Sequence, residues 1–73
     1  MAESAFAAIQ RRQIEITVGE LLLTDDYYMR LEIAERLRHL LAHADPSLDT
    51  ALLSESARDE LAELGIVSLP DTP

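Results

Sequence analysis

Two histidines in this chain have the spacing of a metal site. His39 and His43 stand four residues apart in the stretch HLLAH, so on a helix both side chains lie on one face. Glu35 or Asp45 could add a carboxylate oxygen, which zinc accepts together with imidazole nitrogen. The glutamate of the H-E-x-x-H metal-binding motif is absent, because Leu40 stands there. Histidines near a helix C-terminus are also favourable for the helix dipole alone. We therefore predict no bound metal and no other cofactor.

Ser68 is a second candidate, in the stretch ELGIVSLP near the C-terminus. This stretch resembles the G-x-D-S-L motif of acyl and peptidyl carrier proteins, in which the serine carries a phosphopantetheine arm. Val67 replaces the aspartate of that motif. A helix ending explains the same residues, since Gly65 suits the left-handed position, Ile66 folds back on the helix and Pro70 prevents its continuation. We interpret the stretch as a helix ending.

The remaining reactive residue types do not form a recognisable catalytic motif. The sequence shows no Ser-His-Asp arrangement, glycine-rich phosphate loop or pair of catalytic carboxylates. Arg11 and Arg12 form a basic doublet that is too small to hold a nucleic acid. Tyr27 and Tyr28 follow two aspartates. Tyrosine is enriched at protein interfaces, although one ring could instead close the end of a helical hairpin. We predict that the protein is not an enzyme.

The composition favours a small protein that binds another protein. The chain has 73 residues, 48% of them apolar, no cysteine and a net charge of −8. A core of this size is marginal, and disulfides and thiolate metal sites are excluded. The acidity disfavours direct binding to nucleic acid. The sequence shows neither a membrane span nor a signal peptide, so we expect a cytoplasmic location and no membrane partner.

The pattern of residues predicts a single helical domain. We expect helices over residues 4–23, 26–44, 46–53 and 55–64, with a frayed tail over 70–73. Their predicted N-terminal caps are Ser4, then Thr24 or Asp25, then Asp45, and last Ser54 or Ser56. On the second helix we expect a core stripe and two i,i+4 ion pairs, Asp26–Arg30 and Glu32–Arg36. The stripe consists of Met29, Ile33, Leu37, Leu40 and Leu41.

The first helix is predicted to be apolar on two opposite sides. One stripe contains Ala7, Ile14, Val18, Leu21 and Leu22. The other contains Phe6, Ile9, Ile16 and Leu23. A helix of this kind needs two neighbours. The stretch QIEITV at 13–18 alternates polar and apolar residues and is rich in β-branched residues, so a strand is an alternative for it.

The two longer helices should form a hairpin, with the short C-terminal helices packed against it. We expect the all-α fold to dimerise as a four-helix bundle, so that a second copy covers the free side of the first helix. The stretch GELLLTDDYYMRLEIAERLRHLLAH resembles the helical docking segments at the ends of modular polyketide synthase subunits. Those segments also dimerise through leucine-rich helices joined by acidic breaks.

For function, we predict a small acidic, non-catalytic protein–protein interaction module, such as an adaptor, accessory subunit or docking domain. It would bind itself or another protein. The predicted partner-binding residues are Phe6, Ile9, Ile16, Leu23, Tyr27 and Tyr28.

An alternative is an inhibitor of the phage or plasmid type. It would use its acidic C-terminal third to imitate a nucleic acid or to bind a basic protein surface. The predicted acidic face consists of Asp45, Asp49, Glu55, Asp59, Glu60 and Glu63.

Overall fold

The computed structural model describes residues 3–65. Most of these residues are helical, and none of them forms a strand. The helices are α1 (Ala5–Leu23), α2 (Tyr27–Ala42) and α3 (Glu55–Glu63), with a 3₁₀ turn, η1 (Thr50–Leu52), before α3. The all-α prediction is confirmed. Residues 13–18 lie inside α1, so the strand alternative is wrong. The predictions for Ile66, Ser68, Pro70 and the tail at 70–73 lie outside the described residues.

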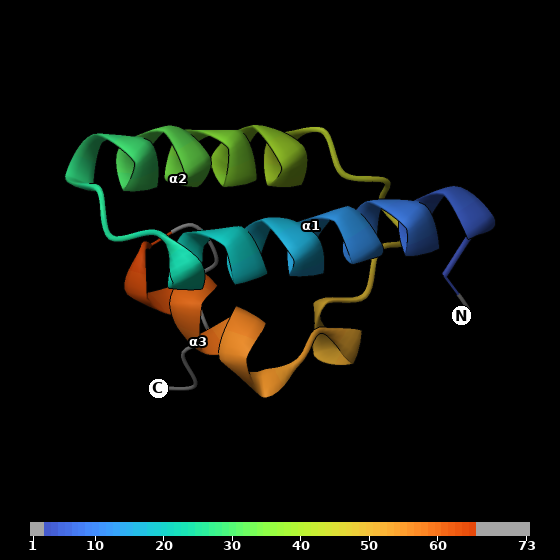
Figure 1. Cartoon of the computed structure of the whole chain (residues 1–73). Helices are drawn as coiled ribbons and strands as arrows, with labels where there is room; N and C mark the ends of the chain where they lie inside the picture. Colours follow the sequence, from blue (N-terminus) through green and yellow to red (C-terminus); the bar gives the residue numbers. More distant parts are fainter. Residues whose placement is uncertain (1–2, 66–73) are drawn as a thin grey trace.

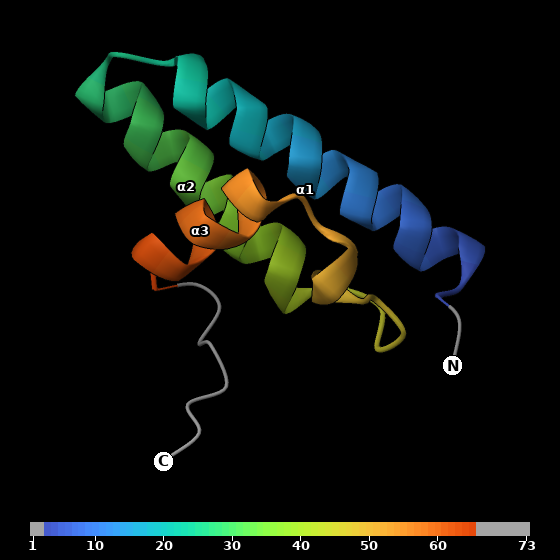
Figure 2. The same ribbon diagram turned by 90° about the horizontal axis from the view of Figure 1, so that it is seen from below.

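The three helices form a hairpin with a third helix packed across it. Helices α1 and α2 run antiparallel and lie side by side, joined by a short turn (Figure 1). Helix α3 lies beneath this pair, as the view from below shows (Figure 2). The connection from α2 to α3 contains η1 and passes along the N-terminal half of α1.

Each helix begins at a side chain that caps a free backbone N–H. Ser4 accepts a hydrogen bond from the Ala7 N–H, and Ser54 accepts one from the Ala57 N–H. These two caps are among those predicted. The cap of α2 is Asp26, which accepts from the Tyr28 N–H, so the predicted cap at Thr24 or Asp25 is wrong. An extended backbone leads into each helix at these positions, as is usual for a capping residue.

The core lies where all three helices meet. Its largest fully buried side chains are Ile14 and Leu21 of α1, Leu37 of α2 and Leu61 of α3. The rest of the core cluster is Val18, Ile33, Leu53 and Ala57, with Leu40, Leu41, Leu48 and Leu64 packed against it. One predicted stripe of α1 is therefore in the core, except for Leu22, which is half-exposed. Met29 of the α2 stripe is also half-exposed.

The segment 46–53 does not form the predicted helix. Only the three residues of η1 are helical, and Asp49 caps them. Asp45 does not cap a helix; its carboxylate accepts hydrogen bonds from both the backbone N–H and the hydroxyl of Ser47. Aspartate side chains commonly make such local bonds in competition with a helix, and a helix as short as the predicted one has little stability of its own.

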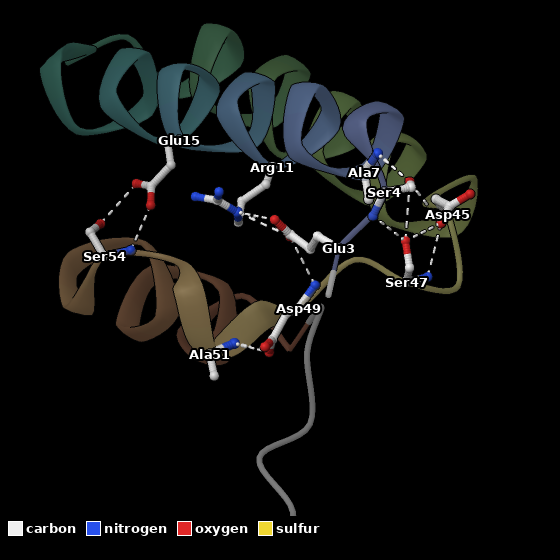
Figure 3. Close-up of polar contacts among 10 residues, drawn as sticks. All are labelled: Glu3, Ser4, Ala7, Arg11, Glu15, Asp45, Ser47, Asp49, Ala51 and Ser54. Carbon is white, nitrogen blue, oxygen red and sulfur yellow. Dashed lines mark hydrogen bonds and ion pairs between the residues drawn. The ribbon is translucent and has the colours of Figure 1, made fainter. Parts of the chain in front are cut away.

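Side chains of α1 and of the residue before its cap hold this connection in place (Figure 3). The Glu3 carboxylate accepts from the Asp49 N–H and from Arg11 at 3.0 Å, and its side chain is only 6% exposed. The Glu15 carboxylate accepts from both the N–H and the hydroxyl of Ser54. These contacts satisfy backbone donors that a helix would otherwise have used.

Gln10 of α1 makes a similar contact at the end of α2. Its side-chain amide donates to the His43 carbonyl at 3.1 Å and accepts from the Asp45 N–H at 2.8 Å. The amide thus bridges the two backbone groups that lead out of α2. This contact fixes where the chain leaves the hairpin.

The observed ion pairs differ from the predicted ones. Arg30 does not pair with Asp26 along α2; it donates to the carbonyls of Leu21 and Thr24 and lies 3.7 Å from Glu60 of α3. Arg36 lies 3.5 Å from Glu20 of α1 rather than beside Glu32. Both arginines therefore connect helices. A long side chain can reach free carbonyls at the end of a neighbouring helix, and a helical-wheel pattern does not include that possibility.

Shortening a core side chain should destabilise the fold. Leu37 is fully buried in the core cluster that includes residues of α1 and α3, so we expect Leu37→Ala to lower the free energy of unfolding by about 2–5 kcal/mol. The half-exposed Leu22 is the matched control, and Leu22→Ala should cost well under half as much. Urea denaturation followed by circular dichroism measures both. Equal losses for the two variants would contradict the assignment of the core.

Acid should weaken the contacts around Glu3 and Asp45. The hydrogen bond from the Asp49 N–H, aided by Arg11, holds the pKa of Glu3 below its usual value. Hydrogen bonds from Ser47 lower the pKa of Asp45 in the same way. A carboxyl group with a lower pKa in the folded state adds stability above its unfolded pKa, and that stability is lost as the pH falls. We therefore expect the wild-type melting temperature to fall from about pH 5 downward.

Substitution of these two carboxylates should reduce this pH dependence. The double variant Glu3→Gln, Asp45→Asn should start from a lower melting temperature at neutral pH and lose less of it in acid. Glu32→Gln, at an exposed position of α2, is the control and should follow the wild type. An unchanged slope in the double variant would show that other groups cause the acid sensitivity.

Candidate protein-interaction surface

An exposed row of large apolar side chains runs along α1. Ile9, Ile16 and Leu23 stand seven residues apart, so they follow one line along the helix with a drift of only about 20° per step. Their exposed fractions are 58%, 60% and 87%. We call these three residues the outer row. Phe6, one turn before Ile9, is 60% exposed.

The outer row is free because the packing of α1 uses its opposite side. Residues of α1 that contact the core lie on the side of Ile14, Val18 and Leu21, and both α2 and α3 pack there. In Figure 2, α2 and α3 both lie to the same side of α1. The predicted two-sided helix is thus observed, with one apolar side buried and the other exposed to solvent.

Two tyrosines follow the end of the outer row. Tyr27 and Tyr28 begin α2 just after the turn that follows Leu23, and they are 66% and 77% exposed. Their rings meet edge to face with centroids 5.5 Å apart. The expectation that one ring closes the end of the hairpin core is therefore wrong. All six predicted partner-binding residues are exposed in the structure.

A shallow groove lies beside the outer row, between α1 and α2. It has a volume of about 390 Å³ and is lined by Gln13, Ile16, Thr17, Arg36 and Leu40. Ile16 therefore belongs both to the row and to the wall of the groove. The Thr17 hydroxyl is paired, because it donates to the Gln13 carbonyl at 2.7 Å. The groove is open and partly polar, so it suits a side chain of a partner better than a small ligand, which needs an enclosed pocket.

A basic residue flanks the first half of the outer row, and an acidic residue flanks the second half. Arg12 lies between Ile9 and Ile16 and is exposed, and within residues 3–65 it has no ion-pair partner. Glu20 lies between Ile16 and Leu23, and about half of its side chain is exposed. Its pair with Arg36 lies at the surface, where such pairs contribute little.

The six predicted acidic residues are in different surroundings. Asp45 binds Ser47, and Glu60 lies next to Arg30 with a side chain only 15% exposed. Asp49 caps η1. The other three are exposed and stand four residues apart, so they form one row on α3: Glu55, Asp59 and Glu63.

The histidine pair gains no further ligand in the described part of the chain. The His39 and His43 rings meet edge to face with centroids 4.6 Å apart. Within residues 3–65, no group of three histidine, aspartate or glutamate side chains could hold a metal ion. Glu35 instead pairs with Arg38 at 3.0 Å. Ser68, the other chemical candidate, lies outside the described residues.

Comparisons with protein-family models, with curated proteins and with solved structures found no match to this chain. Among the described helices, none is long and apolar enough to cross a membrane. The case for a function therefore depends on the surface itself.

Sequence reasoning missed several contributors to the structure and surface. Leu31 is a half-exposed apolar residue that no predicted stripe contained. Glu3, Gln10 and Glu15 bind the connection before α3, although they looked like ordinary surface residues. Their partners are backbone groups more than thirty residues away, and no local pattern in the sequence marks such a contact.

Proposed function

We propose that this protein is a non-catalytic protein–protein interaction module whose binding surface is the outer row of α1, extended by Phe6, Tyr27 and Tyr28. The observation that carries the proposal is the row itself. Three large aliphatic side chains, each more than half exposed, lie in line on one helix. Large apolar side chains gathered on one exposed face support a protein-binding role.

The outer row does not stabilise a single copy of the fold. The core is complete on the opposite side of α1, where Ile14, Val18 and Leu21 are at most 2% exposed. These side chains are 58–87% exposed and gain little from the folded monomer, whereas fully burying an aliphatic side chain of this size contributes about 1.5–3 kcal/mol. A binding role gives these residues a physical reason to be apolar.

The partner that we propose first is a second copy of the chain. Two hairpins packed through their α1 helices would form a four-helix bundle, and such a two-fold dimer covers the same surface on both copies. Leu40 of α2 lines the groove beside the row, and Met29 is half-exposed, so both would add to the contact.

The inhibitor alternative receives less support. Three of its six acidic residues, Asp45, Asp49 and Glu60, are engaged in contacts within the fold. The exposed row on α3 leaves three carboxylates for a basic partner. If that row binds a basic protein, the affinity should fall steeply with salt, whereas an apolar contact through α1 should weaken little.

A charge in the outer row should prevent self-association. Ile16 lies at the centre of the row, so Ile16→Asp would place an unpaired carboxylate in the interface. We expect the wild type to approach twice its monomer mass of 8.1 kDa as concentration rises, and Ile16→Asp to stay monomeric or to dissociate at least about tenfold more readily, since one unfavourable contact costs more than about 1.4 kcal/mol. Sedimentation equilibrium over a wide concentration range measures both.

The matched control is Leu31→Asp on α2. Leu31 is 50% exposed and shares a side of α2 with Arg38, seven residues on, away from the outer row. This variant should associate like the wild type, and circular dichroism should show unchanged helix content in both variants. A wild type that remains monomeric at millimolar concentration would contradict self-association through this surface.

A further inference from the structure

We infer that His39 and His43 together bind one divalent transition-metal ion of the class that favours imidazole nitrogen, with Cu²⁺ bound most tightly. The pair lies at the C-terminal end of α2 and not on the outer row, so this inference is independent of the proposed function. It replaces the prediction, made from the sequence pattern alone, that no metal is bound.

The two imidazole rings already have the spacing that a shared ion requires. Their centroids lie 4.6 Å apart. With metal–nitrogen bonds of about 2.0–2.1 Å, two imidazoles at neighbouring positions around one ion have ring centres roughly 4.5–5 Å apart. Both side chains are exposed, so each ring can turn a nitrogen toward the ion without disturbing the core.

The backbone holds the two histidines in this relation. The His43 N–H donates to the His39 carbonyl at 3.2 Å, so the helical hydrogen-bond pattern continues through the pair. The Gln10 side chain donates from α1 to the His43 carbonyl at 3.1 Å. These two bonds support the last turn of α2, where an unsupported helix end would fray. A pair that is fixed in advance loses less conformational freedom when it binds an ion.

The imidazole nitrogens are available to a ligand. Within residues 3–65, neither histidine side chain takes part in a hydrogen bond or an ion pair. The two nearest arginines of α2 are already paired with carboxylates, Arg36 with Glu20 and Arg38 with Glu35. The negative end of the α2 dipole favours a cation here, as does the net charge of −8.

Two imidazoles select the class of ion. Imidazole suits copper, nickel and zinc, whereas Mg²⁺ and Ca²⁺ prefer oxygen ligands. At a given site the affinity rises from Ni²⁺ to Cu²⁺ and falls again at Zn²⁺. Structural zinc sites use four protein ligands, and within residues 3–65 no third histidine, aspartate or glutamate completes this pair. Water therefore fills the other positions, and the ion exchanges with solution.

Calorimetric titration of the untagged 73-residue chain with CuCl₂ tests the site. We expect one Cu²⁺ per chain. His39→Ala and His43→Ala should each weaken binding by at least about tenfold, because the second imidazole then no longer acts at a high local concentration. Excess CaCl₂ should not compete. Circular dichroism should show unchanged helix content in both variants, since both side chains are exposed.

The matched control keeps two histidines and separates them. The chain has only these two histidines, so the double variant His43→Ala, Arg12→His has the same number. It places the second imidazole at an exposed position of α1. This variant should bind Cu²⁺ as weakly as His43→Ala, to within about threefold.

Thermal melting with NiCl₂ gives a second measurement. An ion that binds the folded pair raises the melting temperature as its concentration increases. At a hundredfold excess over the dissociation constant, we expect the wild type to gain at least about 5 °C. The separated-histidine variant should gain less than half as much at the same concentration.

Each other outcome would overturn the inference. Copper binding that neither alanine variant weakens would mean an adventitious ion only. Wild-type affinity in the separated-histidine variant would show that the spacing of His39 and His43 is irrelevant. A loss on replacing one histidine but not the other would show binding by a single imidazole. None of these outcomes concerns the outer row, so the proposed function is judged by its own test.

Discussion

The structure depends on the fact that α1 is apolar on two opposite sides, while the chain covers only one of them. Ile14, Val18 and Leu21 are buried where α2 and α3 meet. Ile9, Ile16 and Leu23 are exposed on the other side. Apolar side chains exposed to water lose the free energy that burial would provide. This uncovered side of α1 is therefore the feature best explained by a binding partner.

The path of the chain from α2 to α3 follows from contacts that are polar rather than apolar. Glu3, Gln10 and Glu15 bind backbone groups of this connection, and Arg30 joins the end of α1 to α3. These contacts direct the connection along the N-terminal half of α1, so that α3 packs on the core side. The outer row remains uncovered as a consequence.

The proposed function therefore has a physical basis in the two apolar sides of α1, one buried and one exposed. One side organises the monomer, and the other is available for a second protein. The acidic residues of the C-terminal third, by contrast, are divided between internal contacts and a short exposed row.

The sequence by itself predicted the helical class, the Ser4 cap, a last cap at Ser54 or Ser56, and the two stripes of α1. These features depend on interactions between residues a few positions apart, which a sequence pattern records directly. Only the tertiary structure decided that Met29 and Leu22 are half-exposed, that both tyrosines are exposed to solvent, and that 46–53 forms a turn instead of a helix. The reason is that these outcomes depend on how the helices pack against one another and on hydrogen bonds between residues more than thirty positions apart, and no local periodicity encodes such contacts.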